Sequence, residues 1–235
     1  MLRPTIPLDE LIAYLFGAED SSLGAEVRPW LVASPRFRAF AETYRDKIRK
    51  KARGLRDDEG RRDLAFELAI AMRLLEERRF ALEYEPYGAG RRAPDFRVTL
   101  RSLSFNIEVR RLRRSAPADT ARLINAVCDK LGQLPASMIN VLVIGAHGPS
   151  SAAEELVPAM LWLQDRVAHK DEGLFQRRGF AGVRDFLRHY QRLSGAVWLT
   201  GDPGSARASL WRNAQARHPL PADLARRLAP AQRPG

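Results

Sequence analysis

Two carboxylates, Asp95 and Glu108, are the residues of this chain whose types and positions could do chemistry. Residues 94–100 and 103–109 both alternate apolar and polar side chains, which is typical of two β-strands. If Arg101-Ser102 is a two-residue turn, residues whose numbers add up to 203 face each other, and every apolar residue meets an apolar one. The same register sets Asp95 opposite Glu108, with Cβ atoms about 4.5–5.5 Å apart.

Opposed carboxylates repel each other, which destabilises a hairpin unless a cation lies between them. The pair therefore predicts a metal site, with Arg110 one step along on the same polar face. Two alternatives stay open. Each carboxylate could lie on a solvated strand face, and Arg-Ser is not a favoured hairpin turn, so a longer loop could shift the register. A slip of one residue would break both the apolar matching and the carboxylate pair.

The elements around this hairpin predict an α/β fold, with a central mixed β-sheet flanked by helices. A short strand is expected at residues 81–86, and a helix from Asp119 or Thr120 closes at Gln133-Leu134-Pro135. Residues 138–144 then read as a strand buried on both faces, as in a parallel sheet. Further helices are expected at 154–166 and 180–193 and a strand at 196–200, before a tail that wraps the core and ends in a short helix.

Residues 1–60 look like a separate helical extension, which leaves 61–235 as the core with its C-terminal tail. One helix runs from Leu8 towards Gly17, and Ser34-Pro35 supplies the cap and first-turn proline of a second helix through about Lys51. A third helix begins near Asp63 and is apolar around its circumference, so it is buried on more than one side. Glu67 stands alone inside that apolar run and needs either an edge of solvent or a partner.

The charge of the chain favours a polyanionic partner. Lysine and arginine number 39 against 28 acidic residues, a formal +11, of which +6 falls in residues 91–135 and +5 in 136–235. Clustered cations of this kind bind nucleic acid by releasing its condensed counterions. The candidate nucleic-acid contacts are Arg91, Arg92, Arg111, Arg113 and Arg114. However, 34 of the 39 basic residues are arginine, a bias that genome composition also produces, and a charged edge strand is a common structural device.

Several classes of protein are excluded or disfavoured. No apolar run is long enough to span a membrane, and the N-terminus lacks a secretion signal, so we expect a cytoplasmic protein. The single cysteine, Cys128, can form neither an internal disulfide nor a thiolate zinc site, and it lies on an apolar helical stripe typical of the core. The four histidines are scattered without metal-ligand spacing.

The order of these elements, with Pro94-Asp95 on one strand and Glu108-Val109-Arg110 on the next, resembles the restriction-endonuclease-like PD-(D/E)XK nuclease superfamily. The resemblance covers roughly residues 61–147 and extends more loosely to Thr200. It implies that Asp95 and Glu108 bind Mg²⁺ or Mn²⁺ and that Glu67, on the preceding helix, completes the site. Hard oxygen ligands suit Mg²⁺, which activates a water for in-line attack on a phosphodiester.

The sequence departs from the family pattern at Arg110, which stands where the family has a lysine. An arginine can hold a phosphate but cannot give up its proton. Either Arg110 acts as an electrostatic clamp, or Lys130 on the following helix reaches the site in its place, or catalysis has been lost.

The expected function is therefore a metal-dependent nuclease without a membrane partner, for which DNA is the expected substrate and RNA the alternative. The alternative is a catalytically inactive nuclease-fold protein that binds nucleic acid or a protein partner. The sequence is compatible with an oligomer, and it selects neither a substrate shape nor a pathway.

Overall fold

The computed structural model describes residues 6–17, 22–86, 94–112, 120–146, 156–200 and 207–229. The chain forms two compact units, Met1–Arg78 and Arg79–Gly235. The boundary expected after residue 60 falls within the first unit, because the long helix that follows packs with the helices before it.

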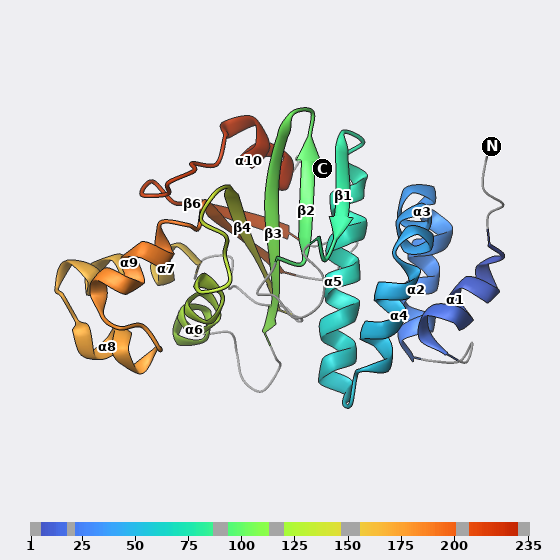
Figure 1. Cartoon of the computed structure of the whole chain (residues 1–235), viewed down its shortest axis with the longest axis horizontal. Coiled ribbons are helices and arrows are strands. Elements are labelled where there is room, and N and C mark those ends of the chain that lie inside the picture. The colour runs from blue at the N-terminus through green and yellow to red at the C-terminus, as the bar shows by residue number, and fades with distance from the viewer. Residues whose placement is uncertain are drawn as a thin grey trace. The chain divides into compact units, whose positions relative to one another are not determined.

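The first unit is helical in its described part (Figure 1). Its helices are α1 (Leu8–Phe16), α2 (Ser22–Ala33), α3 (Pro35–Thr43), α4 (Arg45–Arg53) and α5 (Asp58–Glu76). The Ser34 side chain caps α3 as predicted, because its hydroxyl accepts a hydrogen bond from the Phe37 N–H at 3.1 Å. The single helix expected from Ser34 to about Lys51 is wrong, since it breaks into α3 and α4 at Tyr44.

Helix α5 forms the apolar spine of this unit. It contacts α2, α3 and α4. From Leu64 to Leu75 nearly every residue is buried, as the apolar circumference of the sequence predicts. The buried Glu67 lies in the middle of this spine.

The second unit is built on a six-stranded mixed sheet in the order β1-β2-β3-β4-β5-β6. The strands are β1 (Phe80–Tyr84), β2 (Phe96–Leu100), β3 (Leu103–Leu112), β4 (Ile139–Ala146), β5 (Gly195–Thr200) and β6 (Arg207–Arg212). The pairs β3–β4 and β4–β5 are parallel, and the other neighbours are antiparallel. The predicted α/β class with a mixed sheet is confirmed. β6 was not expected, since residues 207–212 were assigned to a wrapping tail.

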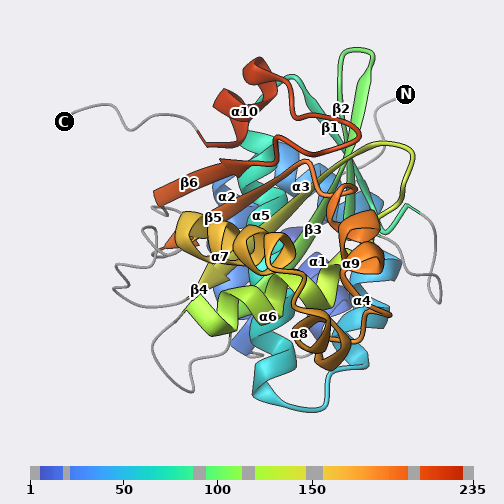
Figure 2. The same cartoon turned by 90° about the vertical axis from the view of Figure 1, so that its left-hand side faces the viewer.

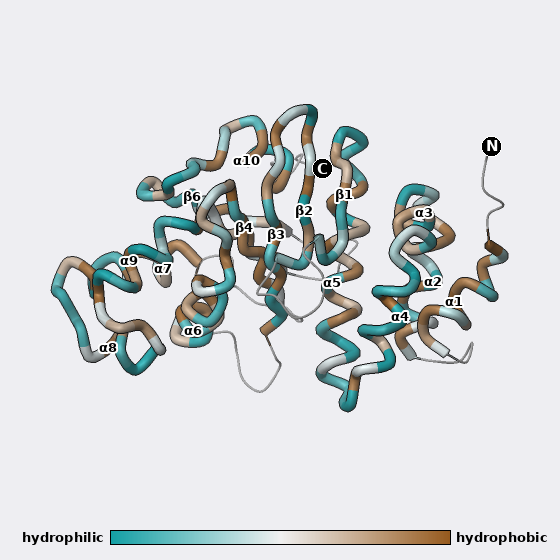
Figure 3. The backbone as a smooth tube through the Cα atoms, in the orientation of Figure 1, coloured by the Kyte–Doolittle hydropathy of each residue, from teal (hydrophilic) through white to brown (hydrophobic). Residues whose placement is uncertain are grey.

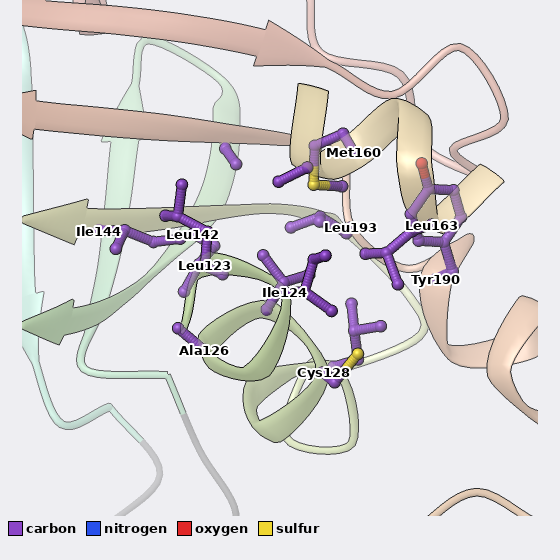
Figure 4. Packing of buried hydrophobic residues seen from close by; sticks show 14 of the residues in the cluster. Leu123, Ile124, Ala126, Cys128, Leu142, Ile144, Met160, Leu163, Tyr190 and Leu193 are labelled. Atoms are coloured by element: carbon purple, nitrogen blue, oxygen red, sulfur yellow. The ribbon is translucent and has the colours of Figure 1, made fainter. Parts of the chain in front are cut away.

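Helices α6 (Thr120–Leu131), α7 (Leu156–Ala168), α8 (Glu172–Arg177) and α9 (Val183–Tyr190) share one hydrophobic core with residues of β4 and β5. Helix α10 (Ala222–Leu228) contacts β6. α6 and α7 lie side by side across the sheet (Figure 2). The apolar side chains of α6 interlock with those of β4 and α7, as Leu123, Leu142 and Met160 show in Figure 4. β4 is apolar along most of its length (Figure 3), as a strand covered on both faces requires.

The register of the β2–β3 hairpin is the one predicted. Phe96 pairs with Ile107, Val98 with Phe105 and Leu100 with Leu103. Arg101 and Ser102 form the two-residue turn, and Arg101 adopts a positive φ of 56°. Because side chains alternate along β3, Asn106, Glu108 and Arg110 share the sheet face on which α6 lies; their partners on β4 are Asn140, Leu142 and Ile144.

Candidate functional site

Glu108 is a buried carboxylate beneath α6. Its side chain is 2% exposed, and its Oε1 accepts a hydrogen bond from the Lys130 ammonium. Lys130 is itself 17% exposed and also donates to Gln133 Oε1 at 3.3 Å. A carboxylate in such a place needs a cation, since an unpaired buried charge is very costly.

The crossover from β3 through α6 to β4 determines this meeting. The apolar stripe of α6, which includes Leu123, Val127 and Leu131, is packed against the sheet. Lys130 lies in the last turn of the helix, so its long side chain reaches back to the strand from which the crossover starts. The structure thus brings Lys130 to Glu108, although 22 positions separate them in the sequence.

Asp95 immediately precedes β2, the other strand of the hairpin. Its Oδ2 accepts a hydrogen bond from the N–H of Val109 at 2.8 Å. That N–H belongs to the peptide bond joining Glu108 to Val109, so the Asp95 carboxylate is held against the backbone of Glu108. The Asp95 carbonyl also accepts the Glu85 N–H at 2.9 Å, which ties this position to the strand beside it.

Two asparagines extend the polar cluster along the same sheet face. Asn106 is 0% exposed, and its Nδ2 donates to Asn140 Oδ1 at 3.0 Å. The Asn140 amide nitrogen in turn donates to the carbonyls of Pro135, Met138 and Arg192 at 2.8–2.9 Å. This network fastens the chain that leaves α6 to the strands beneath it, and so fixes the backbone on either side of the Glu108–Lys130 pair.

Sequence reasoning missed Asn106 and Gln133 as members of this cluster. A signal for the amide pair exists, because an asparagine inside an apolar strand must find a hydrogen-bond partner. Asn140 is such a residue, in the run of residues 138–146. Gln133 gives only a weak signal, since its spacing of three from Lys130 is ordinary at a helix end.

The two arginines that follow Glu108 on β3 face opposite ways. Arg110 is exposed and shares the sheet face of Glu108, one alternation further along the strand. Arg111 is 4% exposed and points to the other face. Arg110 could therefore meet a ligand from solvent, whereas Arg111 does not present a surface cation for nucleic acid.

Glu67 belongs to the first unit and has a lysine partner there. Both of its carboxylate oxygens accept hydrogen bonds from Lys51 Nζ, each at 2.7 Å. Its side chain is 9% exposed and that of Lys51 is 30% exposed. This ion pair joins α4 to α5 and satisfies the carboxylate that the sequence left needing a partner.

The remaining candidate arginines, Arg91, Arg92, Arg113 and Arg114, lie outside the described residues. Within the described ranges, no three histidine, cysteine, aspartate or glutamate side chains gather in a group suited to a metal ion. Mg²⁺ commonly uses only one or two carboxylates and keeps several waters, so the donor set of Asp95 and Glu108 suits this ion in chemistry and number.

Cys128 is no candidate nucleophile, although it is only two residues from Lys130. It belongs to the buried hydrophobic cluster that α6 shares with α7 and α9 (Figure 4). Burial raises the pKa of this thiol to about 12, with nearby charges contributing less. A thiol with such a pKa stays protonated and unreactive at neutral pH.

The chain matches no protein-family model, no curated protein and no solved structure. None of the helices in the described ranges is both long and apolar enough to cross a lipid bilayer.

Proposed function

We propose that this protein is a metal-dependent nuclease of the PD-(D/E)XK type that hydrolyses phosphodiester bonds in nucleic acid, with DNA as the expected substrate and RNA as the alternative. The observation that carries the proposal is the cluster of Asp95, Glu108 and Lys130 at one end of the β2–β3 hairpin. The proposal is also supported by the chain order of α5, β1, β2, β3, α6 and β4, which is the order that the resemblance to the PD-(D/E)XK superfamily implies.

Asp95 and Glu108 would hold Mg²⁺ or Mn²⁺ at this end of the hairpin. A bound divalent ion supplies Lewis-acid chemistry, activating water and neutralising charge on the scissile phosphate. The hydrogen bond from the Val109 N–H orients the Asp95 carboxylate, so this ligand does not have to be ordered on binding.

Lys130 takes the role that Arg110 cannot fill. Its ammonium meets Glu108 and is steadied by Gln133, so it can donate hydrogen bonds to a water or a phosphate oxygen beside the carboxylate. Arg110 keeps its proton under all ordinary conditions and would act as an electrostatic clamp on the phosphate. It is exposed on the same face of β3 and is therefore accessible to a polyanion from solvent.

The test is cleavage of supercoiled plasmid DNA, linear DNA and RNA in Mg²⁺ or Mn²⁺. Glu108→Gln keeps an acceptor for Lys130 but removes the charge, and Lys130→Met removes the ammonium. We expect each variant to cleave slower than the parent by roughly 10²-fold or more. Lys170→Met is the matched control, because Lys170 is exposed and far along the chain from the cluster. Parental rates in both site variants, with folding verified by circular dichroism, would contradict the proposal.

Glu67→Gln, measured alongside, tests the third predicted metal ligand. A loss of metal-dependent cleavage with unchanged thermal stability would support that role. A lower melting temperature with parental cleavage would instead assign Glu67 to the α4–α5 ion pair alone.

A second candidate is a nuclease-fold protein of the cytoplasm that binds nucleic acid without cleaving it. The favouring observation is that the Lys130 ammonium already neutralises Glu108. Binding of DNA by the parent and by Glu108→Gln alike, without cleavage by either in Mg²⁺ or Mn²⁺, would select this candidate.

A further inference from the structure

Helix α4 in the first unit is densely basic. Its nine residues include six cations, Arg45, Lys47, Arg49, Lys50, Lys51 and Arg53, and one acid, Asp46. Only Ile48 is buried, and the helix contacts α1, α3 and α5. Lys51 pairs with the buried Glu67 of α5, whereas Arg45, Lys50 and Arg53 are exposed to solvent.

Elsewhere in this unit arginines are neutralised by nearby acids or used as hydrogen-bond donors. Ion pairs join Arg28 to Asp9 at 2.7 Å, Arg38 to Glu42 at 3.3 Å, Arg62 to Glu59 at 2.8 Å, and Arg61 to Asp58. Arg36 donates to the backbone carbonyls of Leu75 and Glu77. Several arginines in the described part of this unit therefore have a partner within the fold.

Lys50 and Arg53, which lie on the same helix, have no such acidic partner among the described residues. Both are exposed and, in the part of the chain that the structure describes, neither forms an ion pair. They are three positions apart on α4, so their charges lie on one side of the helix, about 5–6 Å apart at Cβ. Like charges so close on a helix repel each other, and Asp46, four positions before Lys50, is the one acid of α4 that offsets them.

Arg45 and Arg49 add to this charge without losing it to a carboxylate. Their guanidinium carbons lie 5.6 and 4.1 Å from the centre of the Tyr14 ring, in cation–π contact. The ring holds the two side chains in place but leaves each with its full positive charge. Arg49 also lies four positions before Arg53, so it continues the same row of cations.

We infer that the α4 basic face, defined as Arg49, Lys50 and Arg53, binds the phosphate backbone of nucleic acid. Such a row of cations can contact successive phosphates of a nucleic-acid strand. Contacts to phosphates do not depend on the base sequence, so we expect binding without sequence specificity. This surface is additional to the Asp95–Glu108 cluster and to the arginines of the second unit. This inference shares with the proposed function only its ligand, nucleic acid, because binding at α4 does not require cleavage.

An anionic membrane fits this helix less well. A helix that lies in a membrane interface needs an apolar face to bury among the lipids. The buried apolar residue of α4, Ile48, is 0% exposed and already packed within the unit. The solvent side therefore offers charge without apolar area.

The experiment measures binding of fluorescein-labelled DNA duplex and single-stranded RNA by the full chain carrying Glu108→Gln, so that cleavage cannot interfere. Lys50→Gln/Arg53→Gln is compared with a control, Arg61→Gln/Arg62→Gln, in which the two arginines already have acidic partners. Both double variants remove two positive charges from the same unit. Titrations run from about 50 to 200 mM salt, over which each phosphate contact changes the affinity severalfold.

We expect the α4 variant to bind more weakly and the slope of log K against log salt to flatten by about 2, roughly one per cation, while the control stays within a factor of about two of the parent. Equal losses in both variants, or none in either, would overturn the inference. So would binding to phosphatidylserine vesicles, lost in the α4 variant, without nucleic-acid binding. Absence of cleavage by the parent in Mg²⁺ and Mn²⁺, together with binding that depends on Lys50 and Arg53, would refute the nuclease proposal and leave this one standing.

Discussion

At the scale of single residues, burial decides which chemical groups can act. Glu108 and Glu67 are both nearly inaccessible, and each meets a lysine. Removing one partner of such a pair costs about 3–5 kcal/mol when both are fully buried, and less where the lysine is partly exposed, as Lys51 is. The same burial that keeps these ions paired keeps the thiol of Cys128 neutral.

The raised pKa of Cys128 leads us to expect that the folded protein loses stability at high pH. Burial raises its pKa from 9.0 to about 12 in the folded chain. Above pH 9 the unfolded thiol loses its proton while the folded thiol keeps it, so the free energy of unfolding falls by up to about 1.4 kcal/mol per pH unit. We expect urea titrations of the parent and of Cys128→Ala, between about pH 8 and 10, to show a difference in stability that shrinks as the pH rises. A constant difference would mean that the thiol ionises equally in both states.

At the scale of elements, the β2–β3 hairpin shows which sequence signal prevails. Arg-Ser is a poor choice for a two-residue turn, yet the turn forms, because it allows the apolar residues of both strands to meet. A left-handed non-glycine residue in the turn costs about 1–2 kcal/mol, whereas each large apolar side chain gains about 1.5–3 kcal/mol when buried. The turn therefore carries strain at Arg101.

That strain is measurable. Arg101 has a φ of 56°, a left-handed conformation that costs a non-glycine residue about 1–2 kcal/mol. Arg101→Gly should stabilise the protein by about 0.5–1 kcal/mol after its own entropy cost in the unfolded chain. The control is Ser102→Gly, at the other turn position, where φ is not positive and glycine should only destabilise. Chemical denaturation of both variants gives the comparison, and a destabilising Arg101→Gly would show that the turn is unstrained.

Other elements were harder to predict, for identifiable reasons. The break between α3 and α4 falls at Tyr44, where the sequence has no glycine or proline. β6 was missed because Arg207–Arg212 lacks a regular alternation and becomes a strand by pairing with the edge of β5. The Asp95–Glu108 register could be predicted, because strand pairing follows local alternation. The Glu108–Lys130 contact could only be raised as an option, since it depends on how α6 packs.

At the scale of the whole molecule, charge totals hid one surface and indicated others. Residues 1–60 carry 11 basic and 10 acidic side chains, so the segment looks neutral. Six of the eleven cations nevertheless fall within the nine residues of α4, a run that the sequence itself shows and that is typical either of a solvated face or of a nucleic-acid-binding arm. The net charge of a segment therefore says little about a helix within it.

Because the chain has few lysines, the reactivity of each one can be followed separately by chemical modification. Its five lysines are Lys47, Lys50, Lys51, Lys130 and Lys170, and two of them contact the two buried glutamates. In reductive methylation read by mass spectrometry, we expect Lys50 and Lys170 to react fast and Lys51 and Lys130 slowly, because an amine held by a carboxylate is shielded. If a divalent ion competes for Glu108, adding Mg²⁺ should speed methylation of Lys130 alone, whereas an unchanged rate would argue against an ion at that carboxylate. Lysine methylation could thus detect a metal ion bound at Asp95 and Glu108 before any substrate is known.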